Sequence, residues 1–236
     1  MMNLAHRGAS EYAPENTLAA FYKGLEMGAS GLETDLRLSR DGIVFLLHDE
    51  RLERTTNGTG RASEYTWKEL QELDAGSWFA AAYAGERLVS LETFLHFFAR
   101  KPIHLALEMK EEGLEEDTLR LLAKYGISNR VTITSFQQGI LRMVRRLDSA
   151  VRIGFLVKQY TEEILAELKE ISAQQICLTA ETITKDGVNR LKAAGLEVRA
   201  WRVRDEALMH HCLECGVDGM TINFPDKLTE ALRRVL

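Results

Sequence analysis

Acidic side chains stand in two apolar segments of the chain: two at alternate positions of residues 31–38, and one, followed at the next alternate position by a lysine, in residues 103–110. Alternate residues of a β-strand face opposite sides, so Glu33 and Asp35 share a face of the first segment, and Glu108 points inward from the second. Burying an unpaired carboxylate costs on the order of several kcal/mol, so acids held together this way need a cation or a proton. The pattern predicts the wall of a divalent-metal site.

Two histidines stand where they could serve such a site. His6 and Arg7 end a segment, residues 2–7, that reads as the first strand, and His48 ends an apolar run after a hairpin signal at 41–42. Imidazole has an unperturbed pKa near working pH, so a histidine at such a site is a candidate for its chemistry. A lone histidine is more often structural, and the folding of the hairpin decides whether His48 reaches the site.

Other interpretations of the acidic strands stay open on the residues alone. Glu33 and Asp35 could be solvated side chains of an edge strand, since acids are mostly exposed in folded proteins. Glu108 and Lys110 could form an ion pair that holds no metal. The repetition of the pattern in two segments favours one shared site.

The elements that must position these residues alternate along the whole chain. Strand-like segments are each followed by apolar residues at i, i+3, i+4 and i+7, the stripe of an amphipathic helix. Eight such pairs predict a (β/α)8 TIM barrel in the α/β class, with a doubly wound open sheet as the alternative, and inward acids then mark the mouth at the strands' carboxyl ends. The expected strands are 2–7, 31–38, 103–110, 131–135, 151–157, 175–179, 196–203 and 217–222, with 43–48 returning antiparallel to the second.

One segment, residues 49–89, interrupts this alternation. Thr66 and Glu69 form a capping box within it, which predicts the start of a short helix. The segment is short and poor in core residues. We therefore expect residues 1–236 to form a single barrel domain with a small insertion after the second strand.

Composition and charge exclude some classes of partner. A hydrophobic fraction of 45%, a charged fraction of 28% and a net charge of −5 are ordinary for a soluble enzyme and give no footprint for nucleic acid. No apolar run approaches the roughly 18 residues of a membrane span, and no signal-peptide core is visible. Three cysteines, Cys177, Cys212 and Cys215, are a sparse, odd set, so we expect no disulfide framework and a cytoplasmic location.

A zinc site around Cys212 and Cys215 is not expected. Together with His211 they follow the apolar stripe of the seventh expected helix, and no second ligand pair accompanies them. The cysteines are better explained as small core residues.

A set of short motifs, in order along the chain, resembles the glycerophosphodiester phosphodiesterase family. Each motif is weak alone, but together they are specific and cover nearly the whole chain, insertion included. The motifs are His6-Arg7-Gly8, Pro14-Glu15-Asn16-Thr17, Glu33-Thr34-Asp35, His48-Asp49 with Arg54-Thr55-Thr56, Glu108-Met109-Lys110, Ser135-Phe136, Trp201 and Val217-Asp218-Gly219.

The resemblance implies a bacterial, metal-dependent hydrolase. Glu33, Asp35 and Glu108 would bind one divalent cation, and all-oxygen ligation suits Mg²⁺ or Ca²⁺. The other implied roles are acid–base catalysis by His6 and His48, phosphate contacts from Arg7 and Lys110, a position near the metal and substrate for Glu15, and an apolar wall from Phe136 and Trp201.

Two positions depart from the family's usual pattern. Asn223 stands where an aspartate is common before the final aromatic-Pro pair. After Trp201, where a Thr-x-Asn run is common, the chain has Arg202-Val203-Arg204. Both lie in loops expected at the barrel mouth, so they bear on substrate choice rather than on the reaction class.

The expected reaction is hydrolysis of glycerophosphodiesters, such as glycerophosphocholine or glycerophosphoethanolamine, to sn-glycerol 3-phosphate and an alcohol. Two alternatives remain: a lysophospholipase-D-like activity on the same fold, and a phosphate- or polyol-binding module without turnover. We expect a small-molecule substrate, no nucleic acid and no membrane span. The sequence does not identify the head-group, and it does not decide between Mg²⁺ and Ca²⁺. It also leaves open whether water attacks the phosphate directly or a cyclic phosphate intermediate forms first. The oligomeric state is open too, with a homodimer as one arrangement.

Overall fold

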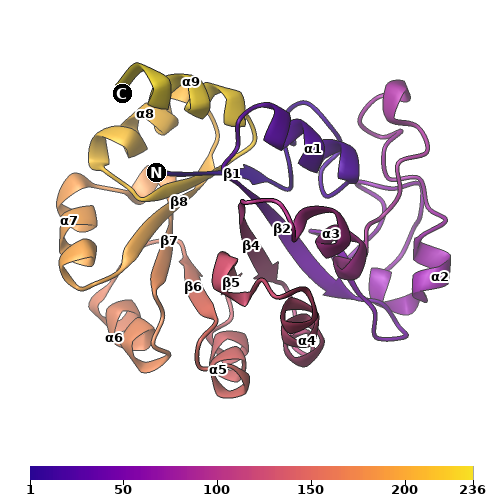
Figure 1. Cartoon of the computed structure of the whole chain (residues 1–236), viewed down its shortest axis with the longest axis horizontal. Coiled ribbons are helices and arrows are strands. Elements are labelled where there is room, and N and C mark those ends of the chain that lie inside the picture. The colour runs from indigo at the N-terminus through magenta and orange to yellow at the C-terminus, as the bar shows by residue number, and fades with distance from the viewer. Residues whose placement is uncertain (236) are drawn as a thin grey trace.

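Eight parallel strands close into a barrel in the computed structural model, which describes residues 1–235 (Figure 1). The strands follow the order β1-β9-β8-β7-β6-β5-β4-β2, and parallel pairing of β1 with β2 closes the ring. A further strand, β3, pairs antiparallel with the end of β2. The strands are β1 (Met2–His6), β2 (Gly31–Leu38), β3 (Val44–Leu46), β4 (His104–Met109), β5 (Val131–Ser135), β6 (Arg152–Val157), β7 (Gln175–Thr179), β8 (Glu197–Val203) and β9 (Gly219–Ile222).

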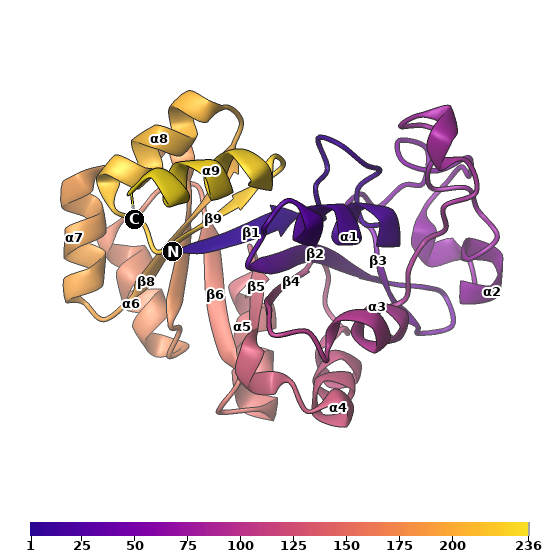
Figure 2. The ribbon, with the colours of Figure 1, turned by 45° about the horizontal axis from the view of Figure 1, so that its top comes forward.

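Helices surround this barrel, as the two views of the ribbon show (Figure 2). The predicted TIM barrel is therefore confirmed, and the expected strand ends agree with the observed ones to within two residues. No helix among residues 1–235 combines the length and the apolar character needed to cross a membrane. The helices of the ring are α1 (Leu18–Glu26), α3 (Leu91–Phe98), α4 (Glu115–Tyr125), α5 (Gln138–Leu147), α6 (Glu162–Glu170), α7 (Lys185–Ala193), α8 (Glu206–Cys215) and α9 (Pro225–Val235).

Side-chain caps fix where several helices begin. Thr17 and Asp205 accept hydrogen bonds from backbone N–H groups in the first turns of α1 and α8. The last helix, α9, begins at Pro225, so Asp226 lies in its first turn. Proline is favoured at the first helical position, and an acid in that turn still complements the helix dipole.

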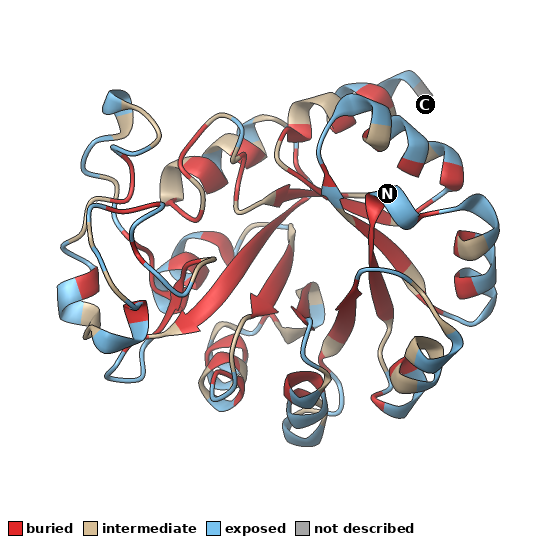
Figure 3. Cartoon of the chain, turned by 180° about the vertical axis from the view of Figure 1, so that it is seen from behind, coloured by how far each residue is buried: buried red, intermediate tan, exposed pale blue. Residues whose placement is uncertain are grey.

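The core lies between the strands and the inward faces of the helices. Figure 3 shows the strands almost entirely buried and the outer faces of the helices exposed. Cys177, Cys212 and Cys215 are buried free thiols, as expected for core residues. Aromatic rings close the packing beneath α1 and α3, where Phe21 lies edge-on to Phe94 at 4.8 Å between centroids.

The segment between β3 and α3 lies to one side of the barrel in both ribbon views (Figures 1 and 2). It contains the short helix α2 (Trp67–Leu70) and the predicted capping box, with Thr66 and Glu69 each binding the other's backbone N–H. A small hydrophobic cluster of its own packs against β3 through Phe45. This arrangement anchors the polypeptide just after His48.

Candidate active site

A strained turn at the end of β1 places the first histidine. Arg7 and Gly8 both have left-handed backbones, with φ of 54° and 83°. A Cβ on Gly8 would lie 2.4 Å from the carbonyl carbon of Ala20 in α1, so only glycine lets the turn pack this closely. Left-handed backbone at a non-glycine residue such as Arg7 is costly and concentrates at functional sites.

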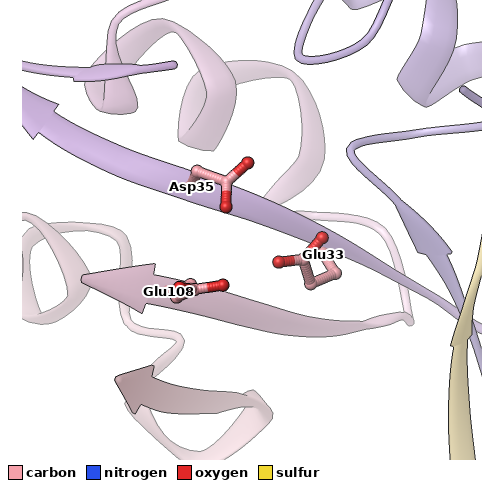
Figure 4. A group of neighbouring side chains, drawn as sticks. All are labelled: Glu33, Asp35 and Glu108. Carbon is pink, nitrogen blue, oxygen red and sulfur yellow. The ribbon is translucent and has the colours of Figure 1, made fainter. Parts of the chain in front are cut away.

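The three acids meet on two neighbouring strands, β2 and β4 (Figure 4). Asp35 on β2 lies beside Glu108 on β4 in the parallel register, and Glu33 lies two residues earlier on β2. One carboxylate oxygen from each lies within 4.8 Å of the others, and all three side chains are buried. The edge-strand interpretation of Glu33 and Asp35 is therefore excluded, because β2 is paired on both sides.

Two cations contact the most buried of these acids. The Nε of Arg7 lies 3.1 Å and the Nζ of Lys110 lies 2.9 Å from Asp35. Lys110 also lies 2.5 Å from Glu108. Burial opposes ionisation of Asp35, but Arg7 and Lys110 outweigh it and lower its pKa well below the usual range.

The pKa of Glu33 shifts in the opposite direction from that of Asp35. Burial, and then repulsion from Asp35 and Glu108, raises the pKa of Glu33 to about 8. Without a further cation this acid would hold a proton at neutral pH. Its Oε2 accepts a hydrogen bond from the backbone N–H of Arg7 at 3.1 Å, which aims the carboxylate at the others.

These donors fit a hard divalent cation. Oxygen ligands lie about 2.0–2.6 Å from Mg²⁺ or Ca²⁺, so ligands on opposite sides of one ion are roughly 4–5 Å apart. The observed spread of up to 4.8 Å is compatible with that geometry. A divalent ion would also remove the mutual repulsion that raises the pKa of Glu33.

The two histidines differ in the group that holds each Nδ1. His6 Nδ1 lies 2.6 Å from the amide oxygen of Asn223, a neutral acceptor that leaves Nε2 without a proton. Burial, followed by the charge of Arg7, lowers the pKa of His6 to about 3. His48 Nδ1 lies 2.6 Å from the carboxylate of Asp49. Burial lowers the pKa of His48 as well, but Asp35 and Asp49 oppose that shift.

The hairpin does bring His48 to the mouth. The guanidinium of Arg37, on the same face of β2 as the acids, donates to the backbone carbonyl of His48 at 2.8 and 3.1 Å. Arg54 then fixes Asp49, with its Nε 2.5 Å from a carboxylate oxygen. The remaining nitrogens of Arg54 bind both oxygens of Glu15 at 2.8 Å.

Glu15 contacts residues of the site but does not line its cavity. It binds Arg7 Nη1 at 3.0 Å in addition to Arg54, so it connects the two arginines. It is not among the residues that line the cavity at the barrel mouth. Burial acts against its ionisation, but Arg54 and Arg7 lower its pKa overall.

A cavity of about 240 Å³ opens at the barrel mouth above the acids. Phe136 and Trp201 form one wall, with ring centroids 5.1 Å apart and planes nearly perpendicular. Trp201 Nε1 donates to the carbonyl of Val157, which leaves the ring face available. The lining residues are His6, Arg7, Glu33, His48, Glu108, Lys110, Phe136, Leu156, Arg199, Trp201, Arg202 and Thr221.

Sequence reasoning missed part of this site. Asn16 donates to Asp35 at 3.1 Å and accepts from Thr34 at 2.7 Å. In the sequence it is part of the motif at residues 14–17, and nothing else there indicates these contacts. Asn223 was visible as a departure from the family pattern, but its contact with His6 spans 217 residues. Arg199 was signalled only by its inward parity with Trp201 on β8.

Known proteins agree with this architecture. A family model described as the glycerophosphoryl diester phosphodiesterase family matches residues 6–227. A glycerophosphodiester phosphodiesterase of Caldanaerobacter subterraneus is 32% identical over 98% of this chain and 97% of its own length. Another, from Bacillus altitudinis, is 32% identical over 94% of each chain.

Solved structures give the same result. A phosphodiesterase from Oleispira antarctica, determined in complex with the product sn-glycerol-3-phosphate, superposes with a TM-score of 0.92 and 30% identity, over 98% of this chain and 96% of its own. A glycerophosphodiester phosphodiesterase from Agrobacterium tumefaciens gives 0.85 with 27% identity, over 96% and 98%. The chain belongs to the glycerophosphoryl diester phosphodiesterase family and is an enzyme that hydrolyses phosphodiesters.

Proposed function

We propose that the chain hydrolyses glycerophosphodiesters such as glycerophosphocholine and glycerophosphoethanolamine to sn-glycerol 3-phosphate and an alcohol. The observation that carries the proposal is a cluster of three buried carboxylates, two of which line the same cavity as both histidines. The Oleispira antarctica relative, whose structure holds sn-glycerol-3-phosphate, supports the choice of substrate class.

Glu33, Asp35 and Glu108 would hold one divalent cation, Mg²⁺ or Ca²⁺. When bound, such an ion supplies Lewis-acid polarisation to a phosphoryl oxygen. Lys110 and Arg7 stand beside the same acids. Their positive charges would therefore also face the phosphate and stabilise the negative charge that develops in the transition state.

The two histidines would divide the acid–base work. His6 has a neutral partner at Nδ1, so its Nε2 carries no proton and is free to accept one from the attacking oxygen. His48 has the Asp49 carboxylate at Nδ1, which stabilises the imidazolium form and suits it to protonate the departing alkoxide. The partners of the rings therefore favour His6 as base and His48 as acid.

The remaining residues would position the substrate. Phe136 and Trp201 offer an apolar wall to the glycerol or the head-group. Glu15 would act through Arg7, holding the guanidinium toward the phosphate. We also propose that residues 1–236 are one domain with 49–89 as its insertion, and that the enzyme works in the cytoplasm, which its three buried free thiols fit.

The test is turnover of a panel of deacylated phospholipids by the His6→Ala and His48→Ala variants. We expect each variant to lose roughly 10²- to 10⁴-fold in kcat, because each histidine supplies a proton transfer. Thermal unfolding of each variant checks that the barrel is intact. Native-like turnover by either well-folded variant would remove that histidine from the mechanism.

A further inference from the structure

Two arginines line the side of the cavity that lies across the barrel from Glu108. Both belong to β8, and in the ring of eight strands β8 stands four strands from β4 in either direction. Arg199 lies at the cavity floor and Arg202 at its rim. This side of the cavity is therefore cationic, opposite the acids that would hold the metal.

Arg199 is a buried charge without a full set of partners. Its side chain is only 2% exposed, and its Nε and Nη2 reach nothing stronger than the sulfur of Cys177, at 3.3 and 3.2 Å. Its Nη1 has no hydrogen-bond partner among the described residues. A buried guanidinium strongly favours a charged acceptor, and a thiol whose pKa is raised by burial is a weak one.

Arg202 is held at the rim by an unusual backbone. Its φ is 60°, within an irregularity of the β8–β9 pairing between Ala200 and Val203. Arg204, two residues on, forms an ion pair with Glu181 at 2.6 Å. Arg202 forms no ion pair within residues 1–235, although its side chain lines the cavity.

The other cations at the mouth are already matched. Arg7 binds Glu15 and Asp35, and Lys110 binds Asp35 and Glu108. Those two would serve a phosphate close to the metal ligands. Arg199, which lines the cavity, and the exposed head of Arg202 are left for a second acceptor farther along the substrate.

We propose that Arg199 and Arg202 form a second anion subsite, which binds an acidic group carried by the alcohol portion of the glycerophosphodiester. This inference rests on the proposed function and specifies its substrate class: diesters whose head-group bears a carboxylate or a phosphate. Charge-assisted hydrogen bonds from a guanidinium to such a group are strong and geometrically specific. Head-groups that lack the acid would leave Arg199 unsatisfied.

The test compares glycerophosphoserine with glycerophosphoethanolamine, which differ only in a head-group carboxylate. We expect the native, metal-supplied enzyme to favour glycerophosphoserine by at least about tenfold in kcat/KM, the value of one charge-assisted hydrogen bond. The preference should shrink as ionic strength rises, because Arg202 is exposed.

Variants assign the preference to the two arginines. Arg202→Asn removes the charge with a residue that tolerates the left-handed backbone, and we expect it to lower the preference roughly three- to fivefold. Arg199→Gln should lower it by about tenfold or more, since that charge is buried. Arg204→Asn, the same change outside the cavity, is the matched control and should leave the ratio unchanged.

Two results would overturn the inference: equal kcat/KM for the two substrates in the native enzyme, or a preference in Arg202→Asn that is as large as in the native enzyme. Arg202 is exposed, so a folding defect in Arg202→Asn does not obscure the answer. Failure of the proposed function looks different, since neither substrate would then be turned over. In that event calorimetric titration of both compounds into the same metal-supplied protein measures the carboxylate preference directly, and equal affinities would refute it.

Discussion

Replacing Asp49 by Asn separates the role of His48 from that of His6. The carboxylate lies 2.6 Å from His48 Nδ1 and 2.5 Å from Arg54 Nε. Asparagine keeps an oxygen that can accept from Nδ1, so the ring stays in place while the negative charge is lost. Because Asp49 raises the pKa of His48 against the effect of burial, its neutralisation lowers that pKa further and depletes the protonated acid.

The size of the effect follows from that single contact. A hydrogen bond to a charged group contributes about 1.5–3 kcal/mol. The Asp49 side chain is 30% exposed, so the lower part of this range applies. About 1.5–2 kcal/mol corresponds to a loss of roughly 10- to 30-fold in kcat.

The assay uses two leaving groups. Ethanolamine leaves as a poor alkoxide that needs a proton, whereas p-nitrophenolate leaves without one. We expect Asp49→Asn to slow hydrolysis of glycerophosphoethanolamine by the full factor and that of the p-nitrophenyl diester much less. Glu50→Gln is the matched control, because it removes the neighbouring acid, whose partner is the exposed Arg61. Equal losses on both diesters would refute His48 as the acid.

Three further predictions address packing, pH and substrate. Gly8→Ala should lower the free energy of unfolding by about 2–4 kcal/mol, because a Cβ there would lie 2.4 Å from the Ala20 carbonyl carbon at a left-handed φ. Calorimetry should show a lower unfolding temperature, and an unchanged one would mean that the turn relaxes. Burial lowers the pKa of His104 to about 4, so the unfolded chain binds more protons than the folded one between pH 6.5 and 4, and stability falls by about 3 kcal/mol as pH falls through that window. Denaturant titrations should therefore show the free energy of unfolding of the native protein falling relative to that of His104→Gln between pH 6.5 and 4, and a constant difference would contradict this. Turnover of a deacylated diester should exceed that of its lysophospholipid, and the reverse order would favour the lysophospholipase-D-like alternative.

The barrel and its acidic centre could be predicted because both depend on local patterns. Alternation of strand and helix segments determines the ring, and the parity of Glu33, Asp35 and Glu108 along two strands determines that they face inward. Parallel pairing of β2 with β4 then brings them together. Nothing beyond strand register is needed for that step.

The second layer of the site could not be predicted because it depends on long-range contacts. Arg54 reaches back 39 residues to Glu15, and Asn223 reaches His6 across 217. The placement of Arg202 depends on a strand irregularity and a positive φ that no pattern in the sequence marks.

The central claim is that three buried carboxylates bind one divalent cation that hydrolysis requires. The most direct measurement is turnover of glycerophosphoethanolamine by chelator-stripped enzyme titrated with Mg²⁺ or Ca²⁺. We expect no turnover at the start and a rise that saturates at one bound ion per chain, with Glu33→Gln needing far more metal. Undiminished turnover by the stripped enzyme in excess chelator would contradict the account.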